Sequence, residues 1–116
     1  MSIAKVVRDA TQDAANGLRV LVLAKSFKTA LMLHEAFESV DIGEVPRKIS
    51  RVSGRWSAEF PSGGILRFYS ANAARTSARG WSADRVYMPA GLSDETKADV
   101  VPVIAASEHG AIIEYP

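Results

Sequence analysis

The sequence contains no cysteine, which excludes a disulfide framework and any thiolate metal site. Its two histidines, His34 and His109, offer little for zinc, so we expect neither a metal nor another cofactor. There is no apolar run of about 18 residues, and the opening segment is polar, without the apolar block of a secretory signal. These absences predict a cytoplasmic protein that does not span a membrane.

A strong excess of either charge is also missing. Lys and Arg together number 14 and Asp and Glu number 13, which gives a formal net charge of +1. This balance provides no general attraction to nucleic acid, so any DNA binding must come from local basic patches. The chain does have 47% hydrophobic residues over 116 positions, enough for one buried core, and we expect a single domain over 1–116.

The spacing of apolar residues predicts helices and strands in alternation. Ile3–Ala15 has apolar residues at three-and-four spacing and ends before Gly17, which suits the left-handed position after a helix. Helices are expected over 3–15, 27–40 and from Ser93 or Asp94 to Ile104; strands are expected over 18–24, 49–52, 56–60, 65–71, 84–88 and 111–115, with a hairpin turn at Ser53-Gly54 and a loop over 72–82. The almost wholly apolar strand 18–24 is typical of a strand buried on both faces. The pattern indicates an α/β fold with a layered, mostly parallel sheet, flanking helices and a β-hairpin.

Several segments follow one another in a recognisable order. The hairpin and strand ISRVSGRWSAEFPSGGILRFYSA precede SARGWSADRVYM, which is followed by PAGLSDETKADVV and PVIAAS. This order resembles the ATPase core of phage terminase large subunits and related helicases. The earlier stretch LRVLVLAKSFKTALMLHEAF resembles the strand and helix that come after the phosphate-loop helix in those proteins. The resemblance implies a RecA-like sheet, related to that of the P-loop NTPases.

The residues that bind and hydrolyse ATP in such proteins are missing. The motif GxxxxGK followed by Ser or Thr does not occur, so there is no glycine loop to surround a phosphate. By the resemblance, residues 1–15 correspond to the helix after that loop, and the chain is expected to begin just beyond it. The resemblance also puts Pro89 and Ala90 at the degenerate Walker B positions, where the family has the acids that hold Mg²⁺ and activate water. We therefore expect no catalytic residues and no enzyme activity.

Two other positions have simple structural interpretations. Lys25-Ser26 opens a helix after a strand, but without a glycine loop we expect a helix cap at Ser26 rather than a phosphate site. His34 has no second ligand or nucleophile at a supporting distance in the sequence, so we expect a packed or solvent-edge histidine.

Basic residues gather in the hairpin and in the loop after the next strand. The candidate nucleic-acid-binding residues are Arg75, Arg79 and Trp81 in the loop and Lys48, Arg51 and Arg55 in the hairpin, together with Arg47, Trp56 and Arg67. Guanidinium groups bind phosphate, and an exposed tryptophan stacks on a base. The alternative interpretation is a solvated loop, with Trp56 and Trp81 in the core.

The sequence thus predicts a non-catalytic, phage-type accessory protein on a degenerate terminase ATPase scaffold that binds DNA through its basic loop. Two alternatives stay open. One is a protein-binding module that acts on a host or phage factor, and the other is one part of a split terminase or helicase ATPase completed by another chain. By the resemblance, strand 111–115 lies on an open sheet edge, which predicts either a homodimer through this strand or cover by the N-terminal helix.

Overall fold

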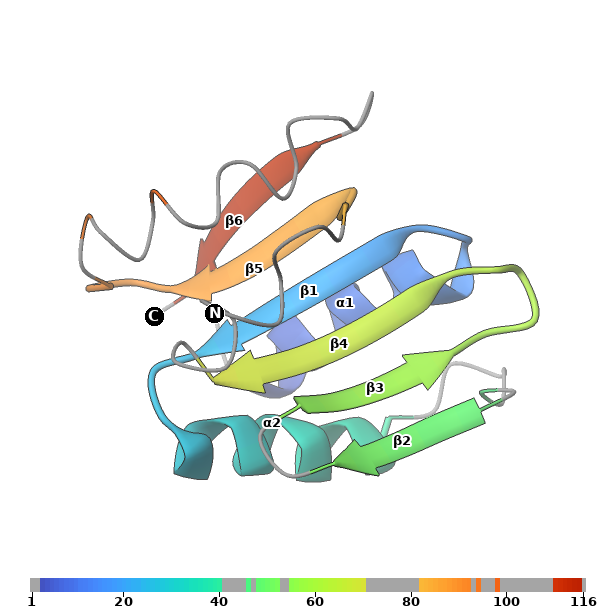
Figure 1. The fold of residues 1–116 in the computed structure, drawn as a ribbon, viewed down its shortest axis with the longest axis horizontal. Coiled ribbons are helices and arrows are strands. Elements are labelled where there is room, and N and C mark those ends of the chain that lie inside the picture. The colour runs from blue at the N-terminus through green and yellow to red at the C-terminus, as the bar shows by residue number, and fades with distance from the viewer. Residues whose placement is uncertain are drawn as a thin grey trace.

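The computed structural model describes residues 3–40, 46, 48–52, 55–70, 82–92, 94, 98 and 110–115, with the backbone alone at 51, 52 and 55. The described helices and strands are α1 (Ile3–Ala15), β1 (Arg19–Ala24), α2 (Phe27–Glu38), β2 (Lys48–Val52), β3 (Arg55–Glu59), β4 (Ile65–Ser70), β5 (Arg85–Pro89) and β6 (Ala111–Tyr115). The strands form one sheet in the order β2-β3-β4-β1-β5-β6 (Figure 1). The pairs from β4 to β6 are parallel, whereas β2, β3 and β4 pair antiparallel. The mostly parallel sheet with flanking helices and a hairpin is confirmed.

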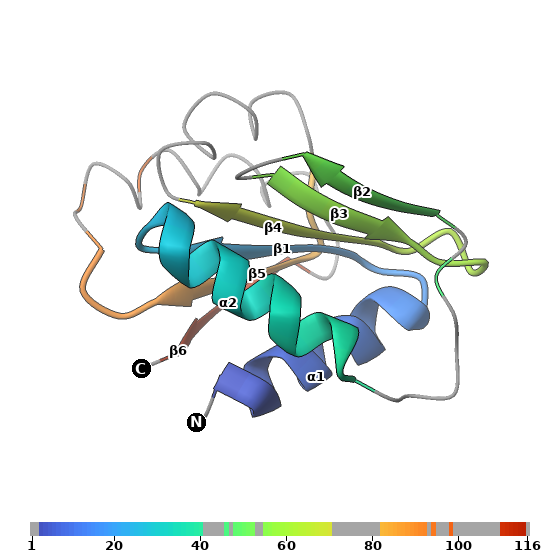
Figure 2. The same ribbon diagram turned by 90° about the horizontal axis from the view of Figure 1, so that it is seen from below.

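Both helices cover the same face of this sheet (Figure 2). The apolar stripe of α1 packs on β1, β4 and β5, and α2 packs on α1, β1 and β4. The buried side chains of this layer include Val6, Val7, Ala10, Ala14, Ala30, Leu33 and Phe37 from the helices and Val20, Val22, Leu66 and Phe68 from the strands. Burial of each large apolar side chain contributes about 1.5–3 kcal/mol, so this layer is the main source of stability.

A smaller apolar cluster lies on the opposite face of the sheet. β1 supplies Leu21 and Leu23, β5 supplies Val86 and Met88, and Ala83 packs with them. β1 is therefore buried on both faces, which explains its almost continuous apolar sequence.

The link between α1 and β1 is a Schellman turn. Gly17 has a φ of 102°, the left-handed conformation expected for it, and its N–H donates to the carbonyl of Ala14 at 3.0 Å. The N–H of Leu18 donates to the carbonyl of Asp13 at 3.1 Å. The strand expected from Leu18 begins one residue later, because the N–H of Leu18 closes the helix instead.

Other element ends differ from the sequence prediction by one or two residues. α2 ends at Glu38 rather than Val40, because the N–H groups of Ser39 and Val40 bond three residues back and tighten the last turn. β5 runs to Pro89, beyond Tyr87, where its pairing with β1 ends. The missing N–H of the proline therefore interrupts no bond between β5 and β1.

The hairpin is confirmed, with β2 and β3 each beginning one residue earlier than expected. Phe60 leaves β3 because its N–H donates to the carbonyl of Gly64 at 2.9 Å, across the turn to β4.

The expected turn at Ser53-Gly54 and the loop 72–81 lie outside the described residues. Of the helix expected to run toward Ile104, the structure describes Asp94 and Ala98, and both are helical. No helix in the described part of the chain has the length and apolar character that a membrane crossing requires.

Candidate nucleic-acid surface

The hairpin half of the sheet has one apolar face and one polar face. Because side chains alternate along a strand, the buried residues Trp56, Ala58 and Phe68 all face the helix layer. The opposite face is toward the viewer in Figure 1. There, five polar residues line a hollow: Lys48 and Ser50 from β2, Ser57 and Glu59 from β3, and Arg67 from β4. These five residues are called the hairpin hollow below.

Backbone pairing brings the five residues together. Lys48 lies opposite Glu59 and Ser50 lies opposite Ser57 across β2 and β3, while Ser57 lies opposite Arg67 across β3 and β4. Directly opposed residues in an antiparallel pair have Cβ atoms about 5 Å apart, close enough for their side chains to interact. The hollow is therefore one connected polar surface supplied by three strands.

The hairpin hollow contains two cations and one carboxylate. Lys48 is exposed, and Arg67 is half-buried with its guanidinium carbon 6.0 Å from the ring centre of Tyr69. Glu59 lies opposite Lys48 and lowers the local positive charge. The hydroxyl groups of Ser50 and Ser57 add hydrogen-bond donors. Lys, Arg and Ser side chains of this kind are the groups that contact phosphate oxygens in nucleic-acid complexes.

The sheet register divides the basic residues expected in the hairpin. Arg55 pairs with Tyr69 and has the same phase along β3 as Ser57, so its position belongs to the face that bears the hollow. Arg51 pairs with Trp56, and its position therefore belongs to the opposite face. The grouping of these arginines by sequence proximity does not correspond to one face of the sheet.

Arg75, Arg79 and Trp81 of the expected basic loop lie outside the described residues. Trp56, in contrast, is a core residue. It is 5% exposed, its ring stacks on His34 with 5.5 Å between ring centres, and the ring of Phe27 lies 5.6 Å away. The alternative interpretation, with Trp56 in the core, is confirmed, and its ring is not available to stack on a base.

His34 is a packed histidine, as expected from the sequence. It is 5% exposed, and its Nε2 lies 2.9 Å from a carboxylate oxygen of Glu38, one helical turn away. Its ring stacks on Trp56 and makes a T-shaped contact with Phe68, in an aromatic cluster that joins α2 to β3 and β4. These contacts give His34 a structural role.

The carboxyl ends of parallel strands are the usual ligand site of α/β folds. Here Ser26 caps α2, as expected, by accepting a hydrogen bond from the N–H of Thr29 at 3.2 Å. Pro89 is buried at the end of β5, and the N–H of Ala90 donates to the carbonyl of Tyr115 at 2.8 Å. Neither Pro89 nor Ala90 has a side-chain oxygen for Mg²⁺. Over the described ranges, no group of three or more His, Cys, Asp or Glu residues could hold a metal ion.

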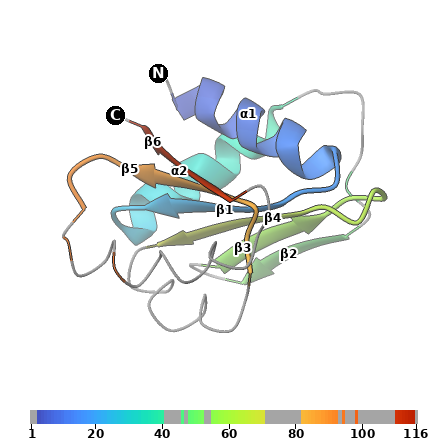
Figure 3. The same ribbon diagram turned by 90° about the horizontal axis from the view of Figure 1, so that it is seen from above.

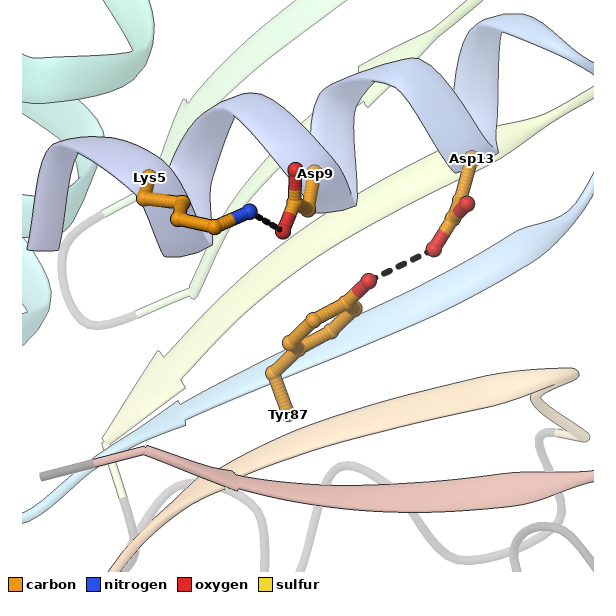
Figure 4. Close-up of polar contacts among 4 residues, drawn as sticks. All are labelled: Lys5, Asp9, Asp13 and Tyr87. Carbon is orange, nitrogen blue, oxygen red and sulfur yellow. Dashed lines mark hydrogen bonds and ion pairs between the residues drawn. The ribbon is translucent and has the colours of Figure 1, made fainter. Parts of the chain in front are cut away.

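A polar bridge that was not expected from the sequence joins α1 to β5 (Figure 4). Tyr87 donates a hydrogen bond of 2.6 Å to Asp13, and Nε of Arg85 lies 3.9 Å from the same carboxylate oxygen. Burial, and then the hydrogen bond to Asp13, raise the pKa of the Tyr87 hydroxyl above its ordinary value. The hydroxyl therefore stays protonated and acts as a donor, which fits a bridge that holds the helix on the sheet.

The fold of this chain is similar to that of a known protein. No family model matches the chain, and no curated protein gives a significant match. Among solved structures, the chain is similar to the large terminase of a thermophilic bacteriophage, determined in complex with ADP, with a TM-score of 0.56 and 11% sequence identity. The match covers 85% of this chain and 26% of the terminase chain, so this chain spans about a quarter of that protein. The resemblance to the terminase ATPase core is confirmed at the level of the fold.

Proposed function

We propose that this protein is a non-catalytic, phage-type accessory protein that uses a terminase-like fold as a scaffold and binds DNA. The observation that carries the proposal is the hairpin hollow, where Lys48 and Arg67 lie beside two serine hydroxyls on a polar sheet face. Cations and hydroxyls in this arrangement suit the DNA backbone and carry little base information. The proposed binding is therefore independent of sequence.

The basic loop belongs to the same proposal by its residue types. Arg75, Arg79 and Trp81 follow β4, the strand that supplies Arg67 to the hollow. Two further guanidinium groups would add phosphate contacts, and Trp81 would stack on an unpaired base. Together the cations of the hollow and of the loop would contact several phosphates of the DNA rather than one.

Two features support a role without nucleotide hydrolysis. The sequence has no GxxxxGK motif, so these 116 residues lack the backbone cradle and the lysine that hold the phosphates in P-loop enzymes. At the end of β5, Pro89 and Ala90 offer no carboxylate for Mg²⁺ or for the attacking water. The fold would then serve to hold the proposed DNA-binding residues in place.

A salt titration of DNA binding tests the proposal. Fluorescence anisotropy with labelled single- and double-stranded oligonucleotides, repeated over a series of salt concentrations, should give a logarithm of affinity that falls linearly with the logarithm of salt. The slope reports how many phosphates the protein neutralises. Oligonucleotides of unrelated sequence should give the same slope. No binding at low salt would refute the proposal.

A protein partner is the second candidate, and α2 supplies the observation that favours it. Phe27, Leu31 and Met32 are 52%, 37% and 46% exposed, which is unusual for large apolar side chains on one helix. The ring of Phe27 also contacts the buried ring of Trp56, so this exposed side chain adjoins the core. No DNA binding at low salt would favour this candidate.

A further inference from the structure

β6 ends the described sheet, and its hydrogen bonds define which of its peptide groups face outward. Of the strands that the structure describes, β5 alone pairs with it. The N–H of Ala111 donates to the carbonyl of Asp84 at 3.1 Å, and the carbonyl of Tyr115 accepts from Ala90 at 2.8 Å. Because alternate residues of a parallel strand bond to the same neighbour, Ala111 and Tyr115 fix the phase of the whole strand. Ile112, out of this phase, directs its N–H and C=O away from β5.

The side chain of Ile112 adds an apolar group at the same place. It is 38% exposed, whereas its neighbour Ile113 packs against the helix-side core and Tyr115 is buried. Natural sheets protect such edges with lysine, proline, bulges or a covering segment. Ile112 is neither charged nor a proline, and it is the second of the five residues of β6.

α1 does not take the covering role that was one expectation from the sequence. It lies on a face of the sheet against β1, β4 and β5. Figure 3 looks down on the β6 side of the molecule and shows α1 on one face of the sheet, toward the top of the picture, rather than over the outer side of β6. The N-terminal helix therefore does not cover the outward N–H and C=O groups of Ile112.

We propose that β6 is a dimerisation edge, on which β6 of a second copy pairs antiparallel around a two-fold axis at Ile112. A two-fold axis normal to the sheet makes identical edge strands antiparallel, and each strand offers the other the same groups. In an antiparallel pair, two outward-facing residues placed opposite each other exchange both N–H···O bonds. Ile112 opposite the partner's Ile112 satisfies this rule and puts the two apolar side chains in contact.

This register also suits the rest of the strand. It pairs Ala111 with the partner's Ile113 on the helix side and Gly110 with the partner's Glu114 on the other side. A register centred on Glu114 would instead oppose two carboxylates, and one centred on Ile113 would put Ile112 against the partner's Glu114. The register centred on Ile112 is the one of the three that puts the two exposed Ile112 side chains against each other, and it opposes no like charges. A sheet that is continuous across the two copies would result.

A pair of charge variants tests both the dimer and its register. Wild-type protein in sedimentation equilibrium should show a monomer–dimer equilibrium. Ile112→Glu and Ile112→Lys should each raise the dissociation constant about tenfold or more, because each puts like charges opposite each other. An equimolar mixture of the two variants should associate again, since opposite charges then face each other across the axis. Because Ile112 is partly exposed, both variants should fold, and circular dichroism provides the check.

Amide hydrogen exchange gives an independent measurement. The Ile112 amide should exchange quickly in dilute wild-type protein and slowly in concentrated protein, whereas the Ile113 amide, in phase with Ala111, should be slow in both. A monomer at all accessible concentrations would overturn the proposal. Undiminished dimerisation of Ile112→Lys would overturn the register, because that result belongs to the arrangement with Ile112 opposite the partner's Glu114.

Discussion

The hydroxyl of Tyr87 donates a 2.6 Å hydrogen bond to Oδ2 of Asp13 and so connects β5 to α1 over 74 positions of sequence. Tyr87→Phe removes the donor and leaves a partly buried carboxylate short of one partner, so we expect a loss of about 1–2 kcal/mol in the free energy of unfolding. Urea denaturation measures it. Asp13→Asn keeps an acceptor and is the matched control, with a smaller loss. An unchanged midpoint in Tyr87→Phe would show that the bridge contributes nothing.

Alkaline pH should destabilise the fold through two buried tyrosines. Burial raises the pKa of Tyr115 to about 12, and burial with the Asp13 hydrogen bond raises that of Tyr87 as well. A raised folded-state pKa means that the unfolded chain loses its protons first as pH rises. The stabilisation is therefore complete below about pH 10 and is lost progressively above it, toward the folded-state values.

Denaturation curves from about pH 9 to about pH 11 measure this effect. Tyr115→Phe should flatten the pH dependence, because it removes one ionising group; it also removes the hydrogen bond from the Tyr115 hydroxyl to the carbonyl of Leu23 and so lowers stability at neutral pH. A pH dependence as steep in Tyr115→Phe as in the wild type would contradict the assignment.

Gly64 is expected to be intolerant of any side chain. A Cβ atom there would lie 1.7 Å from the backbone oxygen of Ala14, where the turn before β4 meets the end of α1. Backbone cannot move aside as a flexible side chain can, so Gly64→Ala should cost about 3 kcal/mol or more. Gly63→Ala is the control: its φ of 92° carries strain, but nothing lies within 4 Å, so we expect about 1–2 kcal/mol. Equal losses would contradict the close approach.

The hairpin hollow should set the salt dependence of DNA binding. Lys48→Ala combined with Arg67→Ala should weaken binding to all sequences and lower the salt slope by about one to two, since each lost phosphate contact removes about 0.7–0.9. Glu59→Gln should strengthen binding by removing the opposing charge. Lys28→Ala removes one exposed positive charge from α2, on the helix side; it is the control for each single replacement and should change little. An unchanged slope in the double variant would move the site away from the hollow.

The basic loop makes a separate contribution in the same proposal. Replacing Arg75 and Arg79 together with alanine should also weaken binding similarly across sequences and flatten the salt slope, because guanidinium–phosphate contacts carry little base information. If only these two replacements matter and the hollow variants do not, the loop alone is the binding surface.

Isothermal calorimetry with Mg-ATP should show no binding. This sequence contains no phosphate-loop motif, and by the resemblance Pro89 and Ala90 stand at the positions of the Walker B acids. Neither phosphate nor metal then has its usual partner. A measured affinity in the micromolar range would overturn the non-catalytic proposal.

The sequence by itself determined the described helices and strands, with their ends correct to within two residues. Ile3–Ala15 has a period that only a helix converts into one apolar face, and Gly17 ends it because glycine adopts a positive φ at little cost. The apolar run of β1 required burial on both faces, and with it a layered sheet. These features are local, since they depend on residues within a few positions of one another.

Only the tertiary structure decided which side chains share a surface. Lys48 and Arg67 were visible as basic residues, but Ser50, Ser57 and Glu59 join them through strand register, in which a shift of one residue moves every side chain to the other face. From the sequence, Trp56 was a candidate for base stacking, but in the structure its ring is buried against α2. Tyr87 and Asp13 meet because α1 lies across β5, and no spacing within either segment encodes that contact. Local sequence fixes backbone conformation and the apolar face of each element, whereas long-range pairing and packing decide what each face meets.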